Sequence, residues 1–412
     1  MELNITQDTI LVTRDNAKSV CRKLPIIARA AIKMLIDLKY GAVTIKWPNG
    51  AVTRIEGQLP GSDATIELLS FDLATRVFKN GDVGVGESYM DEQWKSPDVT
   101  AVLKLFCENN HLMIARQRKF ITGLLLRFIH WRNSNTKTGS KRNISAHYDL
   151  GNSFYKLWLD PSMTYSSALY REKDMDIASA QREKYANLAE LIGIREKDNV
   201  LEIGCGWGGF AEYAAKEIGC KVTALTISQE QHDFAKKRIF EAGLNEKVDI
   251  VFRDYREEKG HYDRIASIEM FEAVGEKYWP VYFDTLRDRL NTRGTAGLQV
   301  ITIKDNLFEK YRASTDFIQR YIFPGGMLPT PQILSKLGSH RGLQLTGEHV
   351  FGHDYADTLV EWRKSFHEAW PEVEKLGFDH RFKRMWEFYM YYCEAGFRSE
   401  NINVRQVAFA KA

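Results

Sequence analysis

Short apolar runs recur through the second half of the chain. They read NVLEIG, KVTALTI, VDIVFRD, YDRIASIEM and GLQVITI, and each has the length and composition of a buried strand. Helical stretches separate them, starting near Gly208, Ser228 and Trp279. Strands that alternate with helices predict an α/β domain with a mostly parallel sheet and right-handed crossovers. In such sheets the ligand binds beyond the carboxyl ends of the strands.

The first part of the chain has a different pattern. KYGAVTIKWPNGAVTRIEG consists of two alternating runs joined at PNG (48–50), which predicts a hairpin. A short strand around DATIELL and a helix over FDLATRVFKN follow, and GDVGVGESYMDEQWKSPDVTAVLKLF is expected to form a loop and then a helix. Gly81, Gly84 and Gly86 are typical of turns, because no strand directly precedes them and no lysine follows. Together these elements predict a small α+β domain.

A segment with many basic and no acidic side chains joins the two parts. Its basic residues are Arg116, Arg118, Lys119, Arg127, Arg132, Lys137, Lys141 and Arg142. Apolar positions near 120–131 predict a helix, and the end, NSNTKTGSKRN, has the composition of a linker. We therefore predict a small N-terminal domain over 1–115, a basic linker over 116–145 and a larger domain over 146–412. The basic helix suits an anionic lipid surface, but a solvated helix packed against the next domain explains the pattern equally well.

Composition narrows the class of protein. The 412 residues are 44% apolar and 12% aromatic, as in globular proteins, and the net charge of +3 favours no partner. The 5 cysteines include no CxxC pair, which argues against a disulfide framework or a bound metal and favours a reducing cytoplasm. We expect neither a signal peptide nor a membrane-spanning helix, and no recognised nucleic-acid module accompanies the basic segment.

The strongest local motif is VLEIGCGWGGF at 200–210. A buried strand ends at Ile203, Gly204 and Gly206 allow a tight turn, and a helix begins near Gly208. The string also satisfies the GxGxxG pattern of dinucleotide-dependent dehydrogenases. Those enzymes carry an acidic residue at the end of the second strand, whereas that strand ends here in ALTIS. The motif therefore favours the nucleoside-binding loop of a methyltransferase.

From about residue 145 to its end, the chain resembles cyclopropane-fatty-acyl-phospholipid synthases, a family that includes mycolic acid cyclopropane synthases and other unsaturated-lipid methyltransferases. The resemblance is carried by HYDLGNSFY, MTYSSALY, VLEIGCGWGGF, LTISQEQ, FEAVG, YIFPGGMLP, FGHDYADTL and the ending from FKRMWEFYMYY onwards. GESYMDEQW is similar to the N-terminal accessory domain of the longer bacterial members. The resemblance implies a Rossmann-like class I methyltransferase fold, S-adenosylmethionine as methyl donor, and a homodimer.

The same resemblance implies the residues that bind S-adenosylmethionine. Tyr165 and Ser166 match positions that hold its amino-acid end, and Gly204 and Gly206 match the turn beneath its ribose and methionine part. The remaining positions follow the second and third strands, where the ribose hydroxyls and the adenine amino group bind: Thr226, Ile227, Gln231, Asp254 and Tyr255.

Methylation of an alkene makes unusual demands on a site. The alkene is a weak nucleophile, and its attack on a methyl group leaves a carbocation, so water must be excluded and aromatic faces can stabilise the charge. The resemblance implies that a bound bicarbonate ion then removes a proton, held by a Glu, a Tyr and neighbouring groups. Glu272 and Tyr355 match that Glu and that Tyr.

Several positions depart from the ring-forming members. Ser167 stands where they have Cys, and Ala273 where they often have His. In the fifth strand they have a His two residues before an Ile; Ile301 and Ile303 fit that spacing, and Gln299 is an alternative match to the His. Because main-chain N–H groups make several of the bicarbonate contacts, Ser167 and Ile301 can still contribute.

We therefore expect methyl transfer to a cis double bond in an acyl chain of membrane phospholipid, giving a cyclopropane ring. The alternative product is a methylated olefin, or a precursor of methyl-branched or furan fatty acids, because the same cation can lose a different proton. A small-molecule methyltransferase and a non-catalytic lipid-binding protein stay open as other classes. The expected partner is the membrane surface, reached from the cytoplasm as a peripheral protein; nucleic acid is not expected.

Overall fold

The computed structural model describes residues 9–112 and 150–411, and the basic segment predicted at 116–145 lies outside them. The chain divides into two compact units. One contains Met1–Gly123 and Gly377–Ser399, and the other contains Leu124–Leu376 and Glu400–Ala412. The sequence-based division placed everything from 146 onwards in one domain, whereas α18 (His380–Arg398) belongs to the N-terminal unit.

A five-stranded sheet in the order β1-β3-β2-β4-β5 forms the middle of the N-terminal unit. Its strands are β1 (Ile10–Leu11), β2 (Tyr40–Lys46), β3 (Val52–Glu56), β4 (Leu59–Leu68) and β5 (Trp94–Lys95). The helices are α1 (Ala17–Val20), a 3-10 turn (Cys21–Lys23), α2 (Ile26–Leu35), α3 (Asp72–Asn80), α4 (Asp82–Met90), α5 (Val99–Glu108) and α18. The predicted hairpin is confirmed, because β2 and β3 pair antiparallel with Val43 opposite Ile55.

The loop predicted from Gly81 is wrong over its first half, where α4 forms. Gly84 of α4 faces α3 so closely that a Cβ atom there would lie 2.3 Å from the carbonyl oxygen of Arg76. Glycine at this position therefore permits helix packing and not a turn. Gly81 does lie between the two helices with a φ of 60°, as expected of a turn residue.

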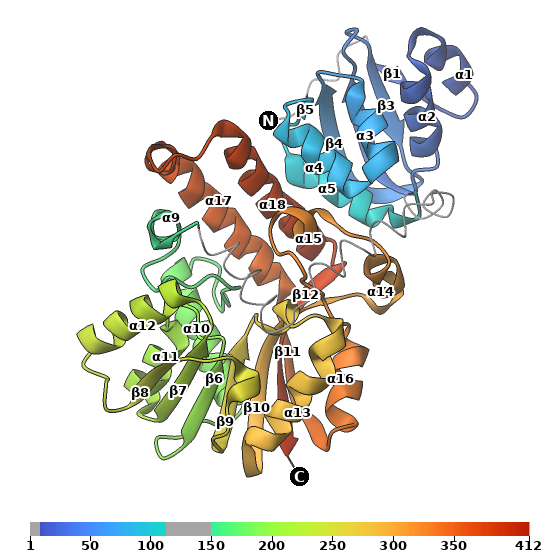
Figure 1. The fold of residues 1–412 in the computed structure, drawn as a ribbon. Coiled ribbons are helices and arrows are strands. Elements are labelled where there is room, and N and C mark those ends of the chain that lie inside the picture. Colours follow the sequence, from blue (N-terminus) through green and yellow to red (C-terminus); the bar gives the residue numbers. More distant parts are fainter. Residues whose placement is uncertain (1–8, 113–149, 412) are drawn as a thin grey trace. The chain divides into compact units, whose positions relative to one another are not determined.

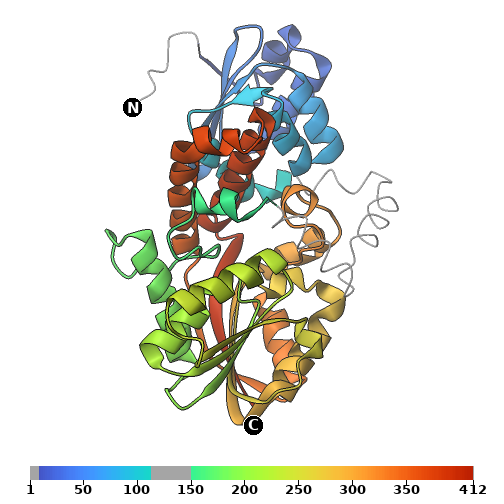
Figure 2. The ribbon, with the colours of Figure 1, turned by 60° about the vertical axis from the view of Figure 1, so that its left-hand side comes forward.

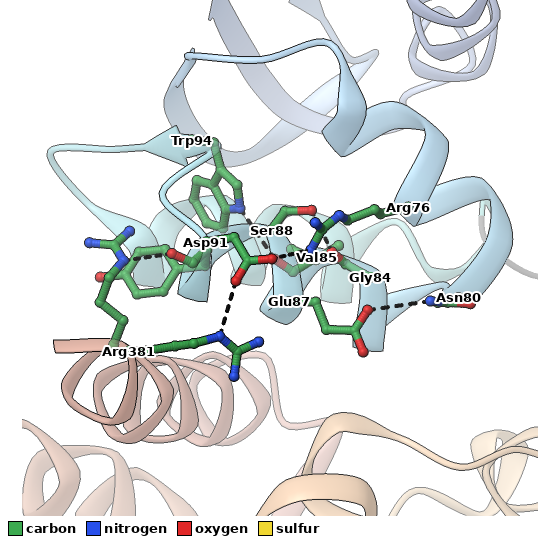
Figure 3. A network of polar contacts seen from close by, with 11 residues as sticks. Arg76, Asn80, Gly84, Val85, Glu87, Ser88, Asp91, Trp94 and Arg381 are labelled. Carbon is green, nitrogen blue, oxygen red and sulfur yellow. Dashed lines mark hydrogen bonds and ion pairs between the residues drawn. The ribbon is translucent and has the colours of Figure 1, made fainter. Parts of the chain in front are cut away.

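Polar contacts attach α18 to this unit (Figure 3). Asp91, directly after α4, accepts hydrogen bonds from Arg76 Nη1 at 2.6 Å and from Arg381 Nε of α18 at 3.1 Å. Arg384 Nε donates to the Tyr89 carbonyl oxygen at 2.6 Å, and its guanidinium lies 3.9 Å from the centre of the Tyr89 ring. These contacts give α18 its partners in the N-terminal unit, although its neighbours in sequence belong to the other one.

A seven-stranded sheet in the order β11-β12-β10-β9-β6-β7-β8 forms the second unit. Its strands are β6 (Asn199–Ile203), β7 (Lys221–Thr226), β8 (Val248–Phe252), β9 (Tyr262–Ile268), β10 (Leu290–Ile303), β11 (Leu343–Val350) and β12 (Ile402–Lys411). The strands from β10 to β8 pair in parallel, and β12 pairs antiparallel with β10 and β11. The predicted α/β class and all the predicted strands of the mostly parallel sheet are confirmed.

Helices cover both faces of this sheet (Figures 1 and 2). The α-helices described in this unit are α9 (Asn152–Lys156), α10 (Ile177–Leu191), α11 (Gly209–Tyr213), α12 (Gln229–Glu241), α13 (Trp279–Arg289), α14 (Asp305–Arg312), α15 (Phe317–Tyr321), α16 (Pro331–Ser339) and α17 (Gly352–Lys375). One apolar cluster, containing Phe210, packs α10, α11 and α12 on one face; another, containing Phe283, packs α13 and α16 on the opposite face. Predicted helix starts are confirmed, since α12 follows its cap Ser228 and α13 begins at Trp279.

Neither a membrane span nor a metal cluster occurs in the part of the chain that the structure describes. Over residues 9–112 and 150–411, no helix combines the length and the hydropathy that crossing a bilayer requires. The described histidine, cysteine and acidic side chains form no group that could hold a metal ion.

Candidate active site

The glycine-rich turn follows β6 at the carboxyl edge of the sheet. Gly204 and Gly206 have φ angles of 83° and 52°, which favour glycine. The N–H groups of Gly204 and Cys205 both donate to the carbonyl oxygen of Leu225, at 3.0 and 2.9 Å, and so attach the turn to β7. A Cβ atom on Gly206 would meet nothing within 4 Å, so this side of the turn is open.

The end of β7 and the segment after it contain three of the residues expected to bind S-adenosylmethionine. Thr226 Oγ1 donates to Gln231 Oε1 at 2.9 Å and accepts from the Ser228 N–H at 3.2 Å. Ser228 caps α12 by accepting from the Gln231 N–H. Ile227, between them, is partly exposed. Thr226 and Gln231 thus hold one another at the end of β7.

Asp254 and Tyr255 follow β8 at the same edge of the sheet. Asp254 caps a 3-10 turn (Tyr255–Glu257), and its carboxylate accepts from Arg256 Nε at 2.8 Å and Arg256 Nη2 at 2.5 Å. The guanidinium of Arg256 lies 5.6 Å from the centre of the Tyr255 ring. The expected adenine-reading carboxylate is therefore held in place by an ion pair that sequence reasoning missed.

Tyr165, Ser166 and Ser167 lie in the loop between α9 and α10. The Tyr165 ring lies 5.2 Å from the Trp362 ring, 5.7 Å from that of Trp158 and 6.5 Å from that of Phe323, centre to centre. Ser166 Oγ accepts from Lys184 Nζ of α10 at 2.6 Å. Aromatic faces and a buried cation therefore flank this loop.

A carboxylate that sequence reasoning missed lies at the centre of the site. Glu269 directly follows β9 and has a φ of 48°, unusual for a residue with a side chain. Its Oε1 accepts from the Ser167 N–H at 2.8 Å and from Gln299 Nε2 at 2.7 Å. Its Oε2 accepts from the Tyr355 hydroxyl at 2.7 Å. Three donors from separate elements thus converge on one side chain.

The predicted Glu272 lies one turn further along, in a 3-10 helix (Phe271–Ala273). Its Oε1 accepts from the Ile301 N–H at 2.5 Å, as the spacing in β10 allows. Its Oε2 is buried and has no hydrogen-bond partner among the described residues. Tyr355, expected near Glu272, donates to Glu269 instead.

The two carboxyl groups have different electrostatic surroundings. Burial raises the pKa of Glu269, while Lys184 and the donors Tyr355, Gln299 and Ser167 oppose that rise. Burial also raises the pKa of Glu272, to about 8, and the nearby charge of Glu269 contributes to the rise. Like charges repel, so we assign the negative charge to Glu269 and a proton to Glu272 at neutral pH.

The remaining predicted positions separate into two groups. Ile301 reaches the site through its backbone, whereas the Ile303 N–H donates to the Pro329 carbonyl oxygen at 3.0 Å and its side chain joins the core. Gln299, the alternative match to the family's His, points at Glu269. Glu269 itself carried one signal in the sequence, because it is an acidic residue directly after a buried strand at the ligand-binding edge.

The turn and its surroundings fit S-adenosylmethionine. Gly206 leaves open space beside the backbone, as the close approach of a nucleoside would require. Glu202 of β6 has a buried Oε2 without a hydrogen-bond partner in the described residues, which leaves a polar atom for a group of a ligand. The acidic cap at Asp254 lies two strands away on the same edge.

Comparisons with known proteins identify the family of the chain. The family model described as mycolic acid cyclopropane synthetase matches residues 135–407. The tuberculostearic acid methyltransferase of Mycobacterium tuberculosis is 36% identical over 81% of this chain and 80% of its own length. The cyclopropane-fatty-acyl-phospholipid synthase of Escherichia coli K12 is 34% identical over 87% of this chain and 90% of its own.

Solved structures give the same assignment. The cyclopropane synthase MmaA2 from Mycobacterium tuberculosis aligns with a TM-score of 0.62 at 28% identity, over 66% of this chain and 98% of that one. The mycolic acid cyclopropane synthase CmaA1, solved in complex with SAH and CTAB, aligns with a TM-score of 0.63 at 27% identity, over 66% and 98%. The fold is that of class I methyltransferases. The chain therefore belongs to the mycolic acid cyclopropane synthetase family of S-adenosylmethionine-dependent methyltransferases, which act on unsaturated lipid chains.

Proposed function

We propose that the chain methylates a cis double bond in an acyl chain of membrane phospholipid, and that the product is a methylated olefin. One observation carries the proposal: the Glu269 carboxylate accepts hydrogen bonds from Ser167, Gln299 and Tyr355. The resemblance places Ser167 and Tyr355 among the groups that would contact a bicarbonate ion. Because these donors are bonded to a side chain of the protein, Glu269 takes the role of that ion as proton acceptor.

The chemistry begins with a weak nucleophile in a dry site. When bound, S-adenosylmethionine supplies an electrophilic methyl group, to which the alkene carbon forms a bond as the sulfur–methyl bond breaks. The positive charge that develops on the acyl chain requires exclusion of water and is stabilised by aromatic faces such as those of Tyr165, Trp362 and Phe323.

Glu269 then determines how the charge on the acyl chain is lost. A proton moves from a carbon next to the cationic carbon to the Glu269 carboxylate, and the C–H electron pair forms the new double bond. Three hydrogen bonds occupy lone pairs of this carboxylate and reduce its tendency to attack the cation directly. Glu272, which keeps its proton, adds no second negative charge.

Ring closure needs the proton to leave from the transferred methyl group instead. Support for the olefin comes from the positions at which this chain departs from ring-forming members, Ser167, Ala273 and Gln299. It also comes from the relative named tuberculostearic acid methyltransferase, at 36% identity, whose name specifies methylation and not cyclopropanation. The alternative product is a cyclopropane ring, and the experiment below distinguishes it from the olefin.

Phospholipid is the proposed substrate class because the relative whose name includes phospholipid matches more of this chain than the mycolic acid enzymes do. The relative named cyclopropane-fatty-acyl-phospholipid synthase covers 87% of this chain, which requires part of the N-terminal unit, whereas the mycolic acid enzymes cover 66%. We also propose that the enzyme works as a homodimer at the cytoplasmic membrane surface, with the N-terminal unit as its accessory domain.

The test supplies the full-length protein with methyl-labelled S-adenosylmethionine and vesicles of dioleoyl phospholipid. We expect label in the acyl chains and proton NMR signals of a methylated olefin. Vesicles of saturated phospholipid serve as the matched control and should take up no label. Absence of label in both lipids would refute lipid methylation, and a high-field ring methylene signal would refute the olefin.

A further inference from the structure

Lys184 is a fully buried lysine in the second unit that the proposed chemistry does not yet use. It lies on α10, and its exposed fraction is 0%. Its Nζ donates to Ser166 Oγ at 2.6 Å. One turn earlier on the same helix, Gln181 Nε2 donates to the Ser166 carbonyl oxygen at 2.9 Å. Two side chains of α10 therefore hold Ser166 in the loop between α9 and α10.

The direction of the Lys184 hydrogen bond fixes the direction of the Ser166 hydroxyl. An ammonium group has three donors and no acceptor, so Ser166 Oγ must accept from it. The hydroxyl proton of Ser166 must then point elsewhere and is polarised by the adjacent positive charge. Ser166 matches the position that holds the amino-acid end of S-adenosylmethionine, whose carboxylate is an acceptor.

The same lysine is connected to Glu269 by two short routes. Ser167, next to Ser166, donates its N–H to Glu269. On the other side, Gln406 Nε2 donates to the Lys184 carbonyl oxygen at 2.9 Å and to Gln299 Oε1 at 3.0 Å, and Gln299 donates to Glu269. Hydrogen bonds thus connect Lys184 with the loop that holds Ser166 and with the proposed base.

We propose that Lys184 is a positioning residue for methyl transfer: its ammonium directs the Ser166 hydroxyl to the carboxylate of S-adenosylmethionine and offsets the negative charge of Glu269. This inference rests on the proposed function. Burial lowers the pKa of Lys184 to about 7, and the carboxylates of Glu269, Asp160 and Glu202 oppose that shift. The titratable groups beside Glu269 are Lys184, the Tyr355 hydroxyl, which donates to it, and the protonated carboxyl of Glu272.

The test compares Lys184→Met with Arg182→Met on the same helix. Arg182 forms an exposed ion pair with Glu217, and its side chain is 58% exposed, so its loss should change nothing. Isothermal titration measures binding of S-adenosylhomocysteine and of methylthioadenosine, which lacks the amino-acid end. We expect Lys184→Met to lower the affinity for S-adenosylhomocysteine by about 10- to 100-fold. The affinity for methylthioadenosine should hardly change. Ser166→Ala, which removes only one oxygen atom, should show the same selectivity, and the double variant should add little.

A pH profile separates positioning from a purely structural role. Without the cation, Glu269 holds its proton to higher pH, so the acid limb of kcat/KM should move to higher pH in Lys184→Met and not in Arg182→Met. The inference would be overturned if Lys184→Met lost affinity equally for both ligands. It would also be overturned if this variant kept the wild-type affinity and its acid limb did not move. The binding measurements use no lipid, so they hold or fail independently of whether the wild-type protein methylates vesicles.

Discussion

At the residue scale, the site depends on two carboxyl groups that the fold treats differently. Glu269 accepts from three donors and interacts electrostatically with the buried Lys184, whereas Glu272 accepts from one backbone N–H and leaves its other oxygen without a partner among the described residues. Environments that differ in this way move the pKa values of two carboxyl groups apart, so that one can act as a base while the other stays a neutral acid. Replacement of each glutamate by glutamine is therefore expected to have a large effect on kcat at Glu269 and a small one at Glu272.

Glu269→Gln should remove the proton acceptor while keeping the size of the side chain. We expect kcat to fall by about 10²- to 10⁴-fold, the usual contribution of a general base. Glu272→Gln mimics the protonated acid and should cost less than about tenfold in kcat, because the group is already neutral at pH 7. Steady-state rates with labelled S-adenosylmethionine measure both. A larger loss at Glu272 than at Glu269 would reverse the assignment.

The stability of Glu272→Gln should depend on pH in a defined direction. In the folded protein the pKa of Glu272 is raised to about 8 from 4.5, so between these values the folded state binds more protons than the unfolded chain. The free energy of unfolding of the wild type therefore falls as pH rises through this range. Glutamine cannot ionise, so the Tm of the variant minus that of the wild type should increase from about pH 5 to about pH 8. A difference that stays constant with pH would show that Glu272 is ionised throughout.

At the scale of elements, local pattern predicts the sheet but not the close approaches between elements. The apolar runs and the glycine turn after Ile203 are local in sequence, and all of them form as expected. The donors to Glu269 lie 102, 30 and 86 residues away, so only the strand order brings them together. Helix α4 was missed for a similar reason, because Gly84 reads as a turn until α3 is known to touch it.

The open side of the glycine turn can be tested with a matched pair of alanine variants. Gly206 and Gly193 both have positive φ, 52° and 66°, and a Cβ on either meets nothing within 4 Å. Both variants should therefore lose a similar, small amount of stability, about 1–2 kcal/mol from the backbone conformation. Only Gly206→Ala places a methyl group at the proposed ligand site, so we expect it to weaken the binding of S-adenosylhomocysteine by roughly 5- to 150-fold. Equal affinity in the two variants would place the ligand elsewhere.

At the scale of the whole molecule, the order of elements along the chain interleaves the two units. Helix α18 packs in the N-terminal unit, yet it is preceded by α17, which contributes Tyr355, and followed by β12, which contributes Gln406. Phe388 of α18 lies 5.6 Å from Tyr89, ring centre to ring centre. Sequence reasoning could not anticipate this, because a long amphipathic helix does not itself indicate which domain it joins.

Removal of residues 1–112 should therefore damage more than an accessory domain. Such a chain keeps α18 but deprives it of Tyr89, Asp91 and α5, leaving apolar surface uncovered. We expect the shortened chain to aggregate, as detected by size-exclusion chromatography. We also expect its Tm, measured by circular dichroism, to be lower than that of the full chain. A truncated protein that is monodisperse and melts at the temperature of the full chain would contradict the assignment of α18.

The most direct test of the central claim is the rate of methyl transfer to dioleoyl phospholipid vesicles in buffer freed of bicarbonate. If Glu269 is the proton acceptor, the wild-type rate is the same with and without added bicarbonate, and Glu269→Ala is inactive until bicarbonate or formate is supplied. A wild-type enzyme that stops when bicarbonate is removed and recovers when it is restored would contradict the account.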